Sequence, residues 1–326
     1  MKAIVHDVYG PPDVLRPAER ERPVPGRGEV LVRVHAAGVD PGVWHLTAGM
    51  PYLIRAAGFG LRRPNNQVRG IDVAGRVAAV GPGVTRLRVG DEVYGGCAGA
   101  FAEYARAKED QLAPKPSTLG FEEAAAVPVS ACTALKALRD VGRLSAGQSV
   151  LVLGASGGVG TFAVQLAKAL GARVTGVCSP GKADLVRSIG ADEVLDYTSQ
   201  DPTDGTRRHD LVLDIAGNRS LTALRRSLTP RGTLVIVGGE GGGRWIGGND
   251  RQLRALLLSP FTGHRLRALA AGVRHEDLLA LTGFIEAGSV TPVVDRVHPL
   301  DEVPEAVRRL RAGQVRGKTV VTVGAG

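Results

Sequence analysis

The sequence GASGGVG at residues 154–160 lies between an apolar run that ends at Leu153 and an amphipathic run with helical spacing. A buried strand, a tight glycine turn and a helix start, in this order, place a diphosphate at the N-terminus of the helix. In the dinucleotide-binding pattern the segment reads A-x-G-x-x-G, with Ala155 at the position of the first glycine. Gly157 would let the backbone approach the pyrophosphate, and Gly160 would let the helix pack closely on the strand. The segment therefore predicts a dinucleotide-binding turn.

The composition fits a protein without membrane segments. The chain has 326 residues, enough for two domains, and 44% of them are hydrophobic, enough for a sizeable core. No segment reaches the roughly 18 uninterrupted apolar residues of a membrane span, the most apolar run being residues 124–138. Residues 1–15 carry no basic stretch ahead of an apolar core, so we expect no signal peptide. Cys97, Cys132 and Cys178 are far apart in apolar or small-residue surroundings, which is typical of reduced thiols and of a cytoplasmic protein.

The formal net charge of +9 raises the possibility of a nucleic-acid partner. The basic residues, however, are mostly arginines dispersed in pairs along expected helices, such as Arg225 with Arg226 and Arg308 with Arg309. The sequence contains no Lys/Arg tract with interleaved aromatic residues, so nucleic-acid binding is not expected. A solvated basic surface and small anionic ligands explain the charge more simply.

Two patterns of expected structure follow each other along the chain. Residues 1 to about 110 have strand and turn character, and residues 112–117 form a junction. Strands and helices alternate after the junction, which favours a parallel sheet with helices on both faces. We therefore expect a mixed α/β protein with a β-rich, barrel-like half. The expected strands are 1–5, 29–35, 73–80, 149–153, 173–178, 211–215, 233–237 and 319–323, and the expected helices are 158–170, 181–189, 219–228, 275–287 and 301–312.

The residues after the second strand of the parallel sheet favour NADPH over NADH. In NAD-binding forms of this arrangement, a carboxylate about 20 residues past the first glycine binds the ribose 2′-hydroxyl. Here the strand ends at Ser179, and no carboxylate follows before Asp184. Ser179 and Lys182 lie where a 2′-phosphate would be, and they offer a hydroxyl and a positive charge. The alternative is that they are ordinary N-cap and first-turn residues of the next helix.

Several blocks along almost the whole chain resemble the medium-chain dehydrogenase/reductase superfamily. They are PGRGEV at 25–30, GIDVAG at 70–75, VG at 80–81, VGDEV at 89–93, and AVP at 126–128 with Thr133 and Ala134. The middle blocks match the pattern G-x-[DE]-x-x-G…VG…GD-x-V of the superfamily. The resemblance implies a GroES-like β-rich catalytic domain at residues 1–115, completed by about 265–326. It also implies a Rossmann NADPH-binding domain at 116–264.

The residues at the zinc positions of the superfamily are not zinc ligands in this chain. Zinc-dependent members place a cysteine soon after the second strand and a His-Glu pair within the glycine motif, where this chain has Val39-Asp40 and Ile71-Asp72. The seven histidines show no ligand spacing with a cysteine, so we expect no metal. The chain therefore resembles the zinc-independent quinone oxidoreductase and enoyl reductase branch. That branch has a motif like V-N-P-x-D beside the nicotinamide, and this chain has Asp40 in place of the asparagine and Val43 in place of the aspartate.

The resemblance assigns cofactor contacts residue by residue. The contacts implied with NADPH are Thr133, Gly154, Ser156, Gly157, Gly158, Val159, Gly160, Ser179, Lys182, Tyr197, Gly217, Val237, Gly238 and Lys318. Candidates for contact with the substrate lie in residues 39–63, where Asp40 could line the pocket and His45 or Tyr52 could donate a proton. The alternatives are that Asp40 only caps the turn before Pro41, and that residues 53–63 are a surface helix and loop rather than a lid.

These expectations lead to one reaction and two rival interpretations. NADPH docks between the two domains and transfers hydride to a quinone or to the β-carbon of an α,β-unsaturated carbonyl compound, because both delocalise the resulting charge onto oxygen. The first rival is a pathway-specific enoyl or enone reductase in biosynthesis. The second is a non-catalytic NADPH-binding relative with a structural or sensing role. The resemblance also implies a homodimer.

Overall fold

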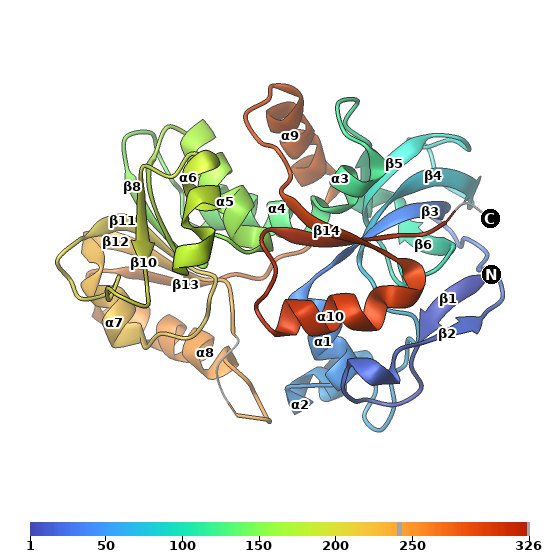
Figure 1. Ribbon diagram of the computed structural model, residues 1–326, viewed down its shortest axis with the longest axis horizontal. Coiled ribbons are helices and arrows are strands. Elements are labelled where there is room, and N and C mark those ends of the chain that lie inside the picture. The colour runs from blue at the N-terminus through green and yellow to red at the C-terminus, as the bar shows by residue number, and fades with distance from the viewer. Residues whose placement is uncertain (240–242, 325–326) are drawn as a thin grey trace. The chain divides into compact units, whose positions relative to one another are not determined.

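The computed structural model describes residues 1–239 and 243–324 of the chain. These residues form two compact units. The first contains residues 1–132, 272–286 and 292–326, and the second contains residues 133–271 and 287–291. The first unit is built on a largely antiparallel sheet and the second on a parallel sheet (Figure 1). The predicted mixed α/β fold, with a β-rich half and a parallel-sheet half, is confirmed.

The compact units divide the chain at other residues than the expected domains. The second unit begins at residue 133, whereas the predicted cofactor domain begins at 116. The second unit also includes residues 265–271 and takes back residues 287–291 from the C-terminal part of the chain. The expected bounds rest on motif positions alone, and they stay predictions.

A seven-stranded sheet and a separate two-stranded sheet form the frame of the first unit over its described residues. The main sheet has the order β14-β15-β3-β4-β5-β7, and β6 pairs with β3 as well. Only β14 and β15 are parallel to each other. The strands are β1 (Lys2–Val5), β2 (Arg16–Glu19), β3 (Glu29–Val39), β4 (Asp72–Val80), β5 (Glu92–Gly96), β6 (Tyr104–Lys108), β7 (Leu112–Pro114), β14 (Val294–Pro299) and β15 (Lys318–Thr322).

The core of the first unit lies on one face of the long strand β3. Val30, Val32 and Val34 alternate along β3 and are buried, together with Phe101 and Val321. Since successive strand residues point to opposite faces, this spacing gives one continuous apolar face. The helices are η1 (Pro12–Val14), α1 (Pro41–Ala48), α2 (Tyr52–Ile54), the π-helical η2 (Arg55–Phe59), η3 (Glu109–Gln111), α3 (Phe121–Ala125), α9 (His275–Glu286), η7 (Leu300–Glu302) and α10 (Val303–Arg311).

The second unit contains an open parallel sheet with the strand order β10-β9-β8-β11-β12-β13. Numbered along the chain this is the order 3-2-1-4-5-6 of doubly wound dinucleotide-binding sheets, in which ligands bind where the order reverses. That reversal lies between β8 and β11. The strands are β8 (Ser149–Leu153), β9 (Arg173–Cys178), β10 (Glu193–Asp196), β11 (His209–Asp214), β12 (Leu228–Ile236) and β13 (Arg265–Ala268).

The helix that follows the first strand of this sheet is almost wholly buried on one side. In α5 (Gly158–Ala169), Phe162 and Leu166 are four residues apart and fully buried, as expected for a helix that packs on a sheet. The remaining helices are α4 (Pro128–Leu135), which crosses from the first unit into the second, η4 (Lys136–Val141), η5 (Pro180–Lys182), α6 (Ala183–Ser188), α7 (Leu221–Arg226), α8 (Asn249–Leu258) and η6 (Ser259–Phe261). No helix in the described part of the chain combines the length and the apolar content needed to cross a bilayer.

Candidate functional site

The glycine turn lies at the carboxyl end of β8, at the reversal of the strand order. Gly154 has a positive φ of 90°, which glycine adopts without strain. The amides of Gly154 and Ala155 donate to the carbonyl of Val177 at the end of β9, at 3.1 and 3.0 Å. On the other side, the amide of Ala216 donates to the carbonyl of Leu153 at 3.1 Å. The turn is therefore fixed by the ends of both neighbouring strands.

Gly157 and Gly160 face different surroundings. A Cβ atom on Gly160 would lie 2.1 Å from the carbonyl oxygen of Gly154 and 2.8 Å from the backbone of Ala155. On Gly157 it would meet only the oxygen of Gly154, at 3.6 Å. Gly160 therefore permits the helix to pack on the turn, whereas the space at Gly157 is open. The sequence motif predicts these two roles, an open approach at Gly157 and close helix packing at Gly160.

The start of α5 fits a diphosphate. Its N-cap is Gly157, which has no side chain to cap the helix. The first amides of a helix have no partner within it, and the helix dipole adds positive potential there. An anion can approach because Gly157 leaves the backbone uncovered. Of the other predicted contacts in this segment, Ser156 is buried, and Gly158 and Val159 are half-buried.

Three more predicted cofactor residues follow the next two strands. Ser179 follows β9 directly, and its carbonyl accepts the backbone N–H of Lys182 at 3.0 Å. The amide of Tyr197, just past β10, donates to the carbonyl of Cys178 at 3.4 Å, so Tyr197 lies next to the end of β9. Asp184, the first carboxylate after β9, is fully exposed and pairs with Arg187 at 2.8 Å. The end of β9 therefore presents a hydroxyl and an ammonium group.

The carboxyl ends of β11 and β12 complete this edge of the sheet, where Gly217, Val237 and Gly238 lie. Asp214, a buried carboxylate that was not predicted from the sequence, accepts hydrogen bonds from all three. Asp214 accepts the amide of Gly217 through its side chain at 3.1 Å, and its carbonyl accepts the amides of Val237 and Gly238 at 3.0 Å each. Its carboxylate also pairs with Arg251. Thr133, the remaining predicted contact of the second unit, is buried in α4.

In the first unit, Asp40, Asp72 and Lys318 form a buried ion cluster. The ammonium of Lys318 lies 2.5 Å from Oδ1 of Asp40 and 2.9 Å from Oδ2 of Asp72. The amide of Val129 donates to Asp72 Oδ1 at 2.8 Å, and the hydroxyl of Ser130 donates to Asp40 Oδ1 at 3.3 Å. Oδ2 of Asp40 is buried and has no hydrogen-bond partner among the described residues. The structure thus gives Lys318, a predicted cofactor contact, two carboxylate partners in the interior.

The two carboxylates of this ion cluster differ in acidity. Burial raises the pKa of Asp72 well above its usual range, and the negative charge of Asp40 raises it further. The pKa of Asp40 is lowered, because the charge of Lys318 and hydrogen bonds from Asp72, Lys318 and Ser130 outweigh its burial. The pKa of Lys318 is raised by both carboxylates against the effect of burial. The pKa values of the two carboxyl groups are therefore shifted in opposite directions.

Asp40 precedes α1 at the N-cap position, but its side chain makes no capping hydrogen bond. The alternative that Asp40 only caps the turn before Pro41 is therefore wrong, since its carboxylate binds Lys318 and Ser130 instead. Nothing in the local sequence reveals this cluster, because Lys318 is 278 residues from Asp40 and 246 residues from Asp72.

His45 contacts Met50 and Tyr52 contacts Arg55, both in the segment that follows Asp40. Nδ1 of His45, in α1, lies 3.2 Å from the carbonyl oxygen of Met50. The guanidinium of Arg55 lies 4.8 Å from the ring centre of Tyr52 and 4.4 Å from that of Tyr9. The hydroxyl of Tyr9 also donates to the carbonyl of Phe59 at 2.8 Å, so the end of this segment is bound to Tyr9.

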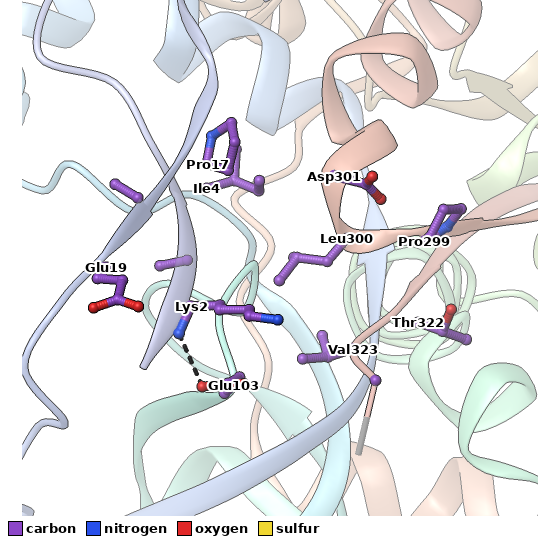
Figure 2. A pocket seen from close by; sticks show the side chains of 13 residues that line it. Lys2, Ile4, Pro17, Glu19, Glu103, Pro299, Leu300, Asp301, Thr322 and Val323 are labelled. Carbon is purple, nitrogen blue, oxygen red and sulfur yellow. Dashed lines mark hydrogen bonds between the residues drawn. The ribbon is translucent and has the colours of Figure 1, made fainter. Parts of the chain in front are cut away.

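A hollow of about 690 Å³ opens in the first unit between β1, β2 and the end of β15 (Figure 2). Ile4, Leu300 and Val323 line its apolar part, and the amide of Lys2 donates to Glu103 at its rim, at 2.8 Å. None of the predicted substrate contacts lines this hollow in the described structure. It is therefore not the predicted active site.

The positions that hold zinc in relatives do not fit a metal here. Asp40 and Asp72 are bridged by an ammonium group, whose charge would repel a divalent cation. Over residues 1–239 and 243–324, no three His, Cys, Asp or Glu side chains are grouped so that they could hold a metal ion.

Two family models match the chain. They describe an alcohol dehydrogenase GroES-like domain at residues 26–117 and a zinc-binding dehydrogenase at residues 189–321. The mitochondrial NAD(P)H oxidoreductase RTN4IP1 of Mus musculus is 33% identical, over 99% of this chain and 89% of the relative. The quinone oxidoreductase of Mus musculus is 31% identical, over 98% of this chain and 96% of the relative.

Solved structures of other proteins share the fold of this chain. The quinone oxidoreductase of Coxiella burnetii superposes with a TM-score of 0.88 at 27% identity and covers 99% of both chains. The mycobacterial protein Rv1454c, solved in complex with NADPH, superposes with a TM-score of 0.83 at 29% identity, over 99% of this chain and all of its own.

Proposed function

Because the chain belongs to the medium-chain dehydrogenase/reductase superfamily, in its quinone oxidoreductase-like branch, we propose that it reduces a quinone or an α,β-unsaturated carbonyl compound with NADPH. The coarser activity, that of an NAD(P)H-dependent oxidoreductase, follows from the relatives. The choice of NADPH rests on the residues that follow β9. There Ser179 and Lys182 are present, and the nearest following carboxylate, Asp184, pairs with Arg187.

The residues of the second unit bind and orient the cofactor in this proposal. The start of α5 binds the diphosphate through its first backbone amides, beginning at Gly158. The hydroxyl of Ser179 and the ammonium of Lys182 bind the 2′-phosphate of the adenosine ribose. NADPH, when bound, supplies the hydride. The chain then contributes orientation, because a held geometry replaces a bimolecular encounter.

His45 and Tyr52 are the candidates for proton donation to the reduced acceptor, and both carry a group that can donate a proton at neutral pH. The buried ion cluster supports a reaction without zinc, because the ammonium of Lys318 already lies between Asp40 and Asp72. We propose that no metal takes part.

Turnover by the purified protein tests the reaction. NADPH oxidation is followed with benzoquinone, phenanthrenequinone and a 2-alkenal as acceptors, and we expect oxidation with at least one of them. Tight NADPH binding without turnover on any of the three would contradict the proposal and favour the non-catalytic relative. Turnover confined to one enone of a biosynthetic pathway would favour the pathway-specific reductase.

The variant Lys182→Ala tests the cofactor preference. Loss of one charge-assisted contact raises the KM for NADPH about tenfold and leaves the KM for NADH nearly unchanged. Lys168→Ala is the matched control, because Lys168 pairs with Asp192 at 2.8 Å on the outer part of α5. Equal effects of Lys182→Ala on both cofactors would remove the assignment of the 2′-phosphate.

We also propose that the chain forms a homodimer through the second unit. The strand β13 is at one end of the described sheet, where its backbone groups can pair with another strand. Near it, Leu253, Leu257 and Phe261 are 60%, 72% and 86% exposed. Phe261→Asp should lower the molar mass in sedimentation to that of a monomer, whereas Leu61→Asp, at a residue 73% exposed in the first unit, should not. A monomeric wild-type protein would overturn this proposal.

A further inference from the structure

The amino edge of the parallel sheet in the second unit carries a cluster of arginines. This edge is opposite to the glycine turn, because all six strands are parallel and the turn follows the carboxyl end of β8. A hollow of about 380 Å³ opens where β8, β9, β10 and β11 begin. The groups that give it its chemistry are Ser149, Arg173, Arg207, Arg208 and His209. The proposed oxidoreductase function uses none of them.

His209 is the unusual member of this hollow. Its side chain is only 5% exposed, and both ring nitrogens are buried without a hydrogen-bond partner among the described residues. Burial of an unpaired polar group costs free energy, so such groups ordinarily have a partner. Burial lowers the pKa of His209, and an imidazole ring carries at least one N–H to donate. An acceptor atom in the hollow would satisfy that donor.

The charges around the hollow favour an anion. Two carboxylates also line it, but each has its own cation: Glu193 pairs with Arg207 at 2.9 Å, and Asp192 pairs with Lys168 at 2.8 Å. Arg173 and Arg208 form no ion pair with a residue that the structure describes, although the charge of Arg173 acts on the nearby carboxylate of Asp210. Two guanidinium groups therefore remain for a ligand, and each offers a fork of donors that matches phosphate oxygens.

A second hollow extends the same edge. It has a volume of about 250 Å³ and is lined by Arg143, Arg231 and Arg265, with Asp210 as the carboxylate. Asp210 accepts the backbone N–H and the hydroxyl of Ser149 at 2.9 Å each, so Ser149 joins the two hollows. Arginines from both hollows thus lie along one edge of the sheet, where their charges add to a common positive potential.

We propose that the hollow at His209 is a second anion site, for a small organic phosphate. The phosphate would lie between Arg173 and Arg208 and accept the N–H of His209. The volume is within the range of small-molecule sites and leaves room for an organic group beside the phosphate. A merely solvated basic surface would explain the arginines, but it would leave the buried ring of His209 without a partner.

Titration followed by the NMR signals of the His209 ring tests this site, because the ring reports on the amino edge and not on the glycine turn. Inorganic phosphate and ribose 5-phosphate are added at constant ionic strength, with sodium chloride as the reference. Both phosphates should give saturable shifts, and ribose 5-phosphate should bind more tightly. Shifts equal to those with chloride would overturn the site. Equal affinity for the two phosphates would overturn the organic part of the proposal.

Two variants separate binding from folding. Arg208 is exposed, so Arg208→Gln should keep the fold and weaken ribose 5-phosphate about tenfold, which is the loss of one charge-assisted hydrogen bond. Arg187→Gln is the matched control, because Arg187 is an exposed arginine of the same unit that pairs with Asp184 outside the hollow. Unchanged affinity in Arg208→Gln, or equal weakening in both variants, would contradict the proposal.

Discussion

The buried ion cluster of the first unit and the glycine turn of the second handle polar groups in opposite ways. In the ion cluster, the ammonium of Lys318 pairs with the carboxyl groups of Asp40 and Asp72 in the interior, with each side chain 5% exposed or less. At the glycine turn, the start of α5 has no capping side chain, and the space beside Gly157 is open. The first arrangement satisfies its charges within the chain, whereas the second leaves donors for an anion. Substitutions should therefore affect stability in the first and ligand binding in the second.

The largest effect is expected from removal of the ammonium group. Lys318→Met leaves the carboxylates of Asp40 and Asp72 buried without their shared cation, which should lower the free energy of unfolding by about 3–5 kcal/mol. Denaturation with urea measures the loss. Lys168→Met removes a lysine from an exposed pair with Asp192 and should cost at most about 1 kcal/mol. Equal losses of unfolding free energy in the two variants would show that the ion pairs of Lys318 stabilise the fold no more than an exposed ion pair does.

A pair of glycine substitutions tests the other side of the comparison. In Gly160→Ala the new Cβ meets backbone at 2.1 Å, so stability should fall by about 1–3 kcal/mol. In Gly157→Ala the nearest atom is 3.6 Å away, so stability should change little. The same methyl group would obstruct the diphosphate and weaken NADPH binding about tenfold.

Urea denaturation and NADPH titration by fluorescence distinguish the two variants. If Gly157→Ala bound NADPH as tightly as the wild type, the open space at Gly157 would not be needed for the diphosphate. If Gly160→Ala were as stable as the wild type, close packing of α5 on the turn would not require glycine at this position.

The sequence predicts the glycine turn because all its parts are local. Strand, turn and helix are contiguous, and the roles of Gly157 and Gly160 follow from their spacing alone. The strands β8 and β9 also have the predicted bounds. The sequence analysis does not include β10, which has only four residues with a carboxylate at each end, Glu193 and Asp196.

The ion cluster and the His209 hollow could not be predicted in the same way. Asp40, Asp72 and Lys318 come from three distant segments, so their contact depends on how β3, β4 and β15 pair. His209 is an ordinary residue in sequence, and its burial depends on the start of β12, where its amide donates to the carbonyl of Ser227 at 2.7 Å. Sheet pairing decides both features, and local patterns do not encode it.

The finest test of the comparison is the pH dependence of stability in Asp40→Asn. The pKa of Asp72 is raised in the folded state, first by burial and then by the charge of Asp40. Folded protein therefore keeps this proton where unfolded protein loses it, and stability falls as the pH rises from the usual value of 3.8 to the raised pKa. Asparagine removes the charge of Asp40, so this fall should shrink by about 1.4 kcal/mol for each unit by which the pKa of Asp72 decreases.

Asp40 also contributes in the opposite direction. Its lowered pKa adds stability above the unfolded value of 3.8, which is lost as the pH falls through the folded pKa. Since the Asp40→Asn variant would lack this contribution, the two changes oppose each other near neutral pH, and the slope against pH is the informative quantity. Urea denaturation between about pH 4 and pH 8 measures it. Asp184→Asn, at a fully exposed carboxylate, should leave the slope unchanged. If Asp40→Asn and wild type had the same slope, the charge of Asp40 would not affect the pKa of Asp72, and the two carboxyl groups would titrate independently.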